Sequence, residues 1–151
     1  MLKWLQESGH AFMSIVFVDK DRYTGPYLKP IGTRPANPIY FRNFLNRQLF
    51  ERHFANHPVI TNESELVFDR VVTEIEELNL KQYLRNNMLL PRLDSIIQCD
   101  SRYVPALQFV DAMIHIVKEI YFGDPASVDG RLLPCINIYD LSLPIKSARP
   151  D

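Results

Sequence analysis

Apolar residues recur along the chain with two different periods, and together they predict strands that alternate with helices. Residues 12–18 (FMSIVFV) are a near-continuous run of aromatic and β-branched residues, which predicts a strand buried on both faces. Residues 65–72 and residues 92–99, centred on Ile96 and Ile97, predict two further strands. Helical periodicity covers three stretches, residues 38–57, 73–87 and 105–122. This order predicts an α/β fold with a mostly parallel central sheet flanked by helices.

The best-marked helix is predicted over residues 105–122. Pro105 suits a first helical turn, and Gly123 followed by Pro125 ends the helix. The predicted inner face is one apolar stripe with steps of three and four residues, made of Leu107, Val110, Ile114, Val117 and Tyr121. Gln108 and Asp111 leave one side of the helix a turn apart, and we expect Asp111 to face inward. There a carboxylate needs a metal, a basic side chain or a backbone donor as its partner.

The other two helices also carry end signals. Asn37 and Pro38 open the first, and acidic residues begin the second at its amino end, where the helix dipole favours them. The predicted inner face of the helix over residues 38–57 is Phe41, Phe44, Leu45, Leu49 and Phe54. That of the helix over residues 73–87 is Ile75, Leu78, Leu80, Tyr83 and Leu84. His53 and His57 have a spacing that metals use on helices, but Pro58 places His57 at a frayed end, so we expect no metal there. Residues 1–8 resemble the last turns of a further helix.

Length, charge and cysteine content restrict the class of protein only loosely. The 151 residues fit one α/β domain over residues 1–123, with residues 124–151 as a proline-containing extension that includes a candidate edge strand over residues 132–143. Residues 20–52 carry seven basic and two acidic residues, and residues 61–80 carry six acidic and one basic. We expect these stretches to pair with each other rather than to offer a basic face to phosphate.

The cysteine pattern, the lack of a long apolar run and the lack of a signal-peptide pattern predict the cellular compartment. Cys99 and Cys135 form neither a disulfide framework nor a zinc spacing, which indicates packed thiols in a reducing compartment. No apolar run reaches the roughly 18 residues of a membrane span, and the first residues lack the order of a signal peptide. The sequence therefore predicts a cytoplasmic protein without a membrane partner.

Three acidic residues stand at comparable places in the predicted fold. Asp19 ends the first strand, Asp69 lies late in the second, and Asp111 follows the third on its helix. If the strands are neighbours, these carboxylates converge at one edge of the sheet and need a cation between them. Mg²⁺ or Mn²⁺ held by such oxygen ligands can activate water against a phosphodiester. The alternative is that these acids are ordinary loop residues, which are common in any α/β domain.

Several short motifs occur in an order that resembles the domain-of-unknown-function 3800 family. They are Val18-Asp19-Lys20, Val67-Phe68-Asp69-Arg70, Asp100-Ser101 and Leu107-Gln108-Phe109-Val110-Asp111, within residues 12–123. The resemblance implies a ribonuclease-H-like three-layer core and a metal-dependent nuclease acting on nucleic acid. Catalysis would then use Asp19, Asp69 and Asp111, with the metal on the last two. Substrate binding would use Lys20, Arg70 and Gln108.

The chain departs from this family at its start. The family pattern begins with a strand ending in Asp-Glu, usually followed by Ser-Gly, whereas this chain has Gln6-Glu7-Ser8-Gly9 and too few residues for that strand. We expect the core to be incomplete and a central metal ligand to be missing. Two alternatives to a self-sufficient enzyme stay open. One is a non-catalytic interaction domain that pairs through an exposed sheet edge, as a homodimer or with another polypeptide. The other is a split protein completed by a separate chain.

Overall fold

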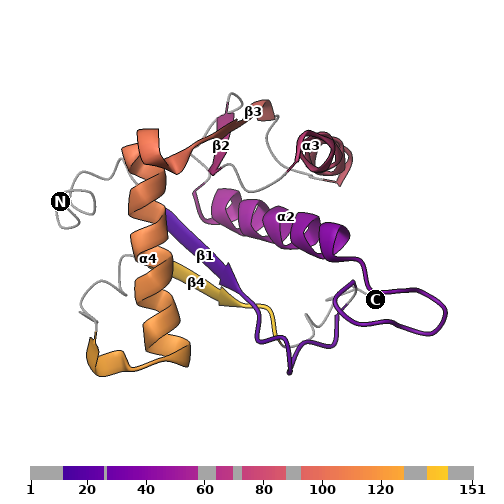
Figure 1. The fold of residues 1–151 in the computed structure, drawn as a ribbon, viewed down its shortest axis with the longest axis horizontal. Coiled ribbons are helices and arrows are strands. Elements are labelled where there is room, and N and C mark those ends of the chain that lie inside the picture. Colours follow the sequence, from indigo (N-terminus) through magenta and orange to yellow (C-terminus); the bar gives the residue numbers. More distant parts are fainter. Residues whose placement is uncertain are drawn as a thin grey trace.

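Strands and helices alternate along the described residues, as the apolar pattern predicts (Figure 1). The computed structural model describes residues 12–25, 27–57, 64–69, 73–87, 93–127 and 136–142. Its elements are β1 (Met13–Phe17), α2 (Pro38–Asn56), β2 (Ser64–Asp69), α3 (Glu74–Asn87), β3 (Leu93–Cys99), α4 (Pro105–Phe122) and β4 (Ile136–Asp140). A 3₁₀ turn, Ser101–Tyr103, joins β3 to α4. The predicted helix over residues 1–8 lies outside the described residues.

The strands pair in parallel, which confirms the prediction from element order, but they form two sheets. β1 pairs with β4, with Phe17 beside Asp140, and β2 pairs with β3, with Asp69 beside Cys99. The described strands therefore make two two-stranded sheets where one central sheet was expected. β4 is the strand predicted within residues 132–143, and its pairing with β1 joins the carboxyl-terminal extension to the start of the fold.

The first core lies between α3 and the β2–β3 sheet. Leu80, Leu84 and Ile96 are buried there, and partly buried apolar side chains pack around them, namely Phe50, Leu66, Phe68 and Tyr83. Leu66 and Phe68 alternate with exposed residues because successive strand side chains point to opposite faces. Ile75 and Leu78 do not face this core and are exposed, so part of the predicted inner face of α3 is wrong. A narrow sheet covers only one side of the helix.

The second core lies between α4 and the β1–β4 sheet. Its buried residues are Met113, Val117 and Ile136, and partly buried neighbours surround them, namely Met13, Ile15, Phe109, Ile116 and Ile138. Val117 is buried as predicted, but Phe109 and Met113 take the places predicted for Val110 and Ile114, one position along, and Val110, Ile114 and Tyr121 are exposed. One residue corresponds to a rotation of about 100° around a helix.

Helix α2 passes between the two sheets and touches both. On one side the ring of Phe50 packs against Phe68 of β2, with centroids 6.2 Å apart. On the other side His53 Nδ1 lies 2.9 Å from Ser14 Oγ of β1. The most buried residues of α2 are Asn43 and Gln48, and neither belongs to the apolar face that the sequence predicted. The reason is that α2 has neighbours on more than one side.

Local signals at the helix ends act as predicted. Asn37 Oδ1 accepts a hydrogen bond from Tyr40 N at 3.0 Å and caps α2. Thr73 N donates to Glu76 Oε2 at 2.9 Å at the start of α3. Glu76 also forms an ion pair with Arg42 of α2 at 3.2 Å, which confirms that the basic and acidic stretches contact each other.

Among the described helices, none combines the length and the apolar content that crossing a bilayer requires.

Candidate functional site

The 3₁₀ turn after β3 brings together several of the predicted motif residues. Asp69, the last residue of β2, accepts a hydrogen bond through Oδ1 from Ser101 N at 3.0 Å. Asp100 Oδ1 accepts from Arg102 N, also at 3.0 Å, and caps the turn. Gln108 Nε2, from the first turn of α4, donates to Arg102 O at 3.2 Å. Side chains from β2 and α4 thus hold one short turn between them.

The position of Asp69 follows from the parallel register. Asp69 lies beside Cys99, so its carboxylate reaches the chain where it leaves β3. The first N–H groups of a helical turn have no partner within the turn, and an aspartate oxygen supplies one. This contact gives Asp69 a structural role whether or not it has a chemical one.

Asp111 lies on the exposed surface of α4, so the expectation that it faces inward is wrong. The packed side of the helix runs through Phe109, Met113 and Val117 instead. Asp111 still follows Gln108 by one helical turn. Asp111 is therefore exposed to solvent, one helical turn from Gln108, which contacts the 3₁₀ turn.

Asp19 is separated from this turn by the sheet topology. It follows β1, whereas Asp69 ends a strand of the other sheet. Asp19 N donates to Ser142 Oγ at 2.7 Å, and Asp19 Oδ1 accepts from Asp21 N at 3.0 Å. Lys20 is exposed beside it, and Arg70 lies outside the described residues. Within the described ranges, no three or more His, Cys, Asp or Glu side chains are grouped as metal ligands would be.

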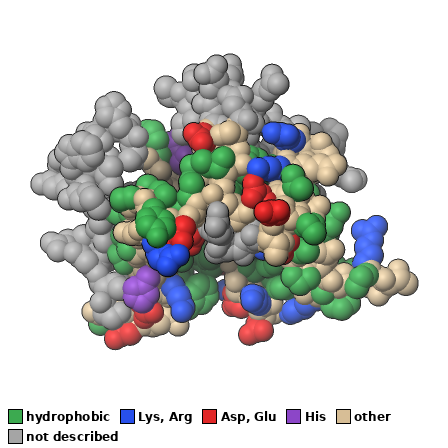
Figure 2. Space-filling model, turned by 45° about the horizontal axis from the view of Figure 1, so that its top comes forward, with side chains coloured by type: hydrophobic (Ala, Val, Ile, Leu, Met, Phe, Trp, Pro, Cys, Tyr) green, Lys and Arg blue, Asp and Glu red, His purple; other side chains and the backbone are tan. Residues whose placement is uncertain are grey.

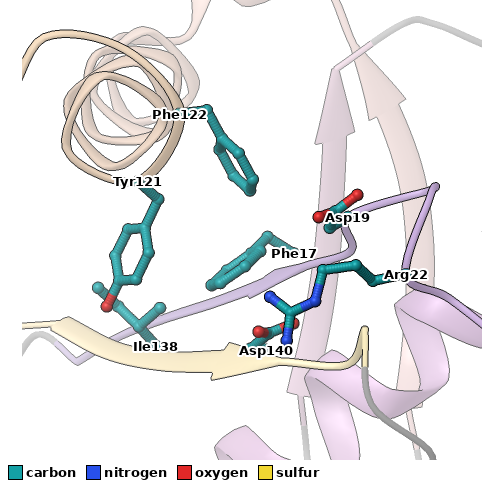
Figure 3. Close-up of a pocket in the computed structure, with 7 residues that line it drawn as sticks. All are labelled: Phe17, Asp19, Arg22, Tyr121, Phe122, Ile138 and Asp140. Carbon is teal, nitrogen blue, oxygen red and sulfur yellow. The ribbon is translucent and has the colours of Figure 1, made fainter.

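A cavity of about 350 Å³ lies at the carboxyl ends of β1 and β4 (Figure 3). It is lined by Phe17, Asp19, Arg22, Tyr121, Phe122, Ile138 and Asp140. The ring of Phe17 packs against Tyr121 and Phe122, with centroids 4.9 and 5.4 Å apart. Arg22 reaches from the loop after β1 toward Phe17 and Asp140 (Figure 3). The cavity therefore combines aromatic walls with carboxylate acceptors and a guanidinium donor.

The sequence indicates only part of this cavity. Asp19 was a candidate because polar residues at the carboxyl ends of parallel strands often carry chemistry. Arg22 and Asp140 were missed, because no local pattern places β4 beside β1. Asp140 Oδ1 also accepts from Ser142 N at 2.8 Å, which orders the chain after β4 next to Asp19.

His53 of α2 and His57, which caps the end of that helix, contact polar side chains of β1 and β4. Their rings lie 4.9 Å apart, and His57 Nε2 lies 3.2 Å from Asn137 Nδ2 of β4. Phe12 stacks on the His57 ring at 4.0 Å. Burial, followed by the nearby charge of His57, holds the pKa of His53 below its usual value. These contacts connect α2 to both strands of the sheet.

The elements and contacts define an α/β protein with short parallel sheets and three described helices. Comparison of the chain with protein-family models, with curated proteins and with solved structures finds no match.

Proposed function

We propose that the chain is a protein-interaction domain that binds another polypeptide through α4. The observation that carries the proposal is an outer stripe on this helix, made of Val110, Ile114 and Tyr121. These side chains are 44%, 49% and 48% exposed. They recur at helical spacing beside the packed face, so apolar residues cover about half of the helix circumference.

The alignment of these side chains distinguishes them from ordinary surface residues. Single exposed apolar residues are common on soluble proteins, whereas a contiguous apolar patch marks a binding surface. The open face of the β2–β3 sheet offers less, because Val67 and Ile97 are 37% and 38% exposed. Pairing at the edges of this sheet is a further route, since β2 and β3 bond only to each other among the described strands. The α4 stripe exposes the larger apolar side chains.

Sedimentation velocity of the purified chain at rising concentration tests this proposal. We expect Ile114→Asp to abolish concentration-dependent association, because it places a charge at the centre of the stripe. Ile75→Asp on α3 is the matched control, since Ile75 is 73% exposed and lies on another helix. Circular dichroism would verify that both variants are folded. A chain that stays monomeric throughout would exclude a second copy as the bound polypeptide, and an Ile114→Asp variant that associates like the wild type would contradict the proposal.

A second candidate function is a divalent-metal-dependent phosphodiester hydrolase of the ribonuclease-H-like kind that the sequence resembles. Its support is that Asp69 and Gln108 contact the same turn, with Asp111 one helical turn beyond Gln108. Two carboxylates with water as the remaining ligands suit Mg²⁺ or Mn²⁺. The ion would supply an activated water, and Asp69 and Asp111 would hold it.

In this second candidate the chain's other predicted residues would handle the nucleic acid. Lys20 and Arg70 would balance phosphate charge and Gln108 would donate to a substrate oxygen, whereas Asp19 would take no part, since it follows a strand of the other sheet. Manganese titration of the wild type and of Asp111→Asn, followed by thermal unfolding, tests the metal site. Glu74→Gln on α3 is the control. Equal stabilisation of all three by the metal, together with inactivity on single strands, duplexes and RNA–DNA hybrids, would reject the hydrolase.

A further inference from the structure

The outer stripe of α4 is flanked by two residues of opposite charge. Asp111 and Lys118 are seven positions apart on α4 and both are exposed. Seven residues are close to two helical turns, so these side chains leave the same side of the helix about 10.5 Å apart along its axis. Ile114 lies between them in the sequence. The flank of the stripe therefore carries one charge of each sign, nearly equidistant from its centre.

We infer that the polypeptide bound by α4 is a second copy of this chain, with the two α4 helices packed antiparallel about a two-fold axis beside residues 114 and 115. The inference rests on the proposed function and names its partner. The axis brings Ile114 against Ile114 of the second copy. It also sets Asp111 opposite Lys118 of the second copy. The two-fold axis repeats this contact on the same flank, at an equal distance beyond the axis.

Charge complementarity favours this arrangement over the alternatives. In an antiparallel pair, residues at equal distances from the axis on one flank face each other, so both ion pairs form together. In a parallel pair the two-fold axis runs along the helices and puts this flank of the two copies on opposite sides of the interface, so neither charge would meet its complement. Acidic and basic side chains are interspersed on the face of the molecule shown in Figure 2.

The remaining charges of the helix do not interfere with this pairing. His115 and Glu119 are four apart and lie 4.0 Å from each other. Their positions fall on the side of α4 away from Val110, because they follow it by five and nine residues. They leave the stripe and its flank available.

A charge swap, measured by sedimentation equilibrium, tests the inference. Asp111→Lys and Lys118→Asp each place like charges opposite each other twice, and we expect each to weaken the dimer by at least about tenfold. The double variant Asp111→Lys with Lys118→Asp restores opposite charges and should return the dissociation constant to within about threefold of the wild type. Glu74→Lys on α3 is the control and should leave the dimer unchanged.

The outcomes separate this inference from the proposed function. Recovery in the double variant supports the antiparallel pair, and it also excludes misfolding as the cause of the single-variant losses. If Ile114→Asp abolishes association but the double variant does not recover, the second-copy arrangement is wrong and the interaction surface stands. If association is insensitive to Ile114→Asp, the interaction surface itself is wrong.

Discussion

Replacing Asp69 tests whether its carboxylate holds the turn after β3. Asp69→Ala removes the acceptor that Ser101 N contacts at 3.0 Å. A hydrogen bond to a charged group contributes about 1.5–3 kcal/mol, and the part-buried position of this one reduces the expected loss to about 1–2 kcal/mol. Asp69→Asn keeps an oxygen at the same place and should lower the free energy of unfolding by no more than about 0.5 kcal/mol.

Urea unfolding followed by circular dichroism measures these differences. A domain of this size has a free energy of unfolding of about 5–15 kcal/mol, so a loss of 1–2 kcal/mol shifts the midpoint clearly. Asp21→Ala is the control, since its exposed carboxylate should change stability by less than about 0.5 kcal/mol. If Asp69→Ala matches the wild type, or if Asp69→Asn is as damaging as Asp69→Ala, the assigned contact does not hold the turn.

Three further changes test the packing and the charges elsewhere. Leu84→Ala empties a fully buried position at 0% exposure in the α3 core and should cost about 2–5 kcal/mol in urea unfolding, and a loss below 1 kcal/mol would contradict its core role. Thr73→Ala removes the cap of α3 and should cost about 1 kcal/mol, and an unchanged midpoint would argue against the cap. The pKa of His53 lies below 6.5 in the folded state, so folding favours the neutral ring, and this contribution is complete above pH 6.5 and lost as the pH falls through the folded pKa. Thermal unfolding of His53→Gln between pH 7.5 and 5 should show a weaker pH dependence than the wild type, and an equal dependence would exclude His53 as its source.

The limits of the elements could be predicted because they depend on neighbouring residues. Asn37 with Pro38 marks the start of α2, and Pro105 with Gly123 brackets α4. Caps, proline and glycine act within one turn, so the chain carries these signals regardless of its tertiary partners. The run over residues 12–18 identified β1 in the same way.

The sequence did not predict which strands lie side by side. This pairing determines which of the candidate site residues come together. β1 pairs with β4, which comes from the far end of the chain, so Asp19 lies beside Asp140 and Ser142 instead of beside Asp69. No local pattern specifies such a long-range pairing. The contact of Gln108 with the 3₁₀ turn was within reach of the sequence, because the turn and α4 follow one another directly, whereas the contact of Asp69 with Ser101 depends on the pairing of β2 with β3.

The predicted inner face of α4 is correct at Val117 and wrong at Val110 and Ile114, and this difference has a physical cause that bears on function. Apolar residues occupy two adjacent stripes, one through Phe109 and Met113 and one through Val110 and Ile114. Periodicity reports that a stripe favours burial, but it does not report whether the covering surface belongs to the same chain. The β1–β4 sheet covers the first stripe, and the second keeps Ile114 49% exposed between Asp111 and Lys118. Among the described residues, Val110 and Ile114 continue the pattern of a core yet stay about half exposed, which is what an interface between chains requires.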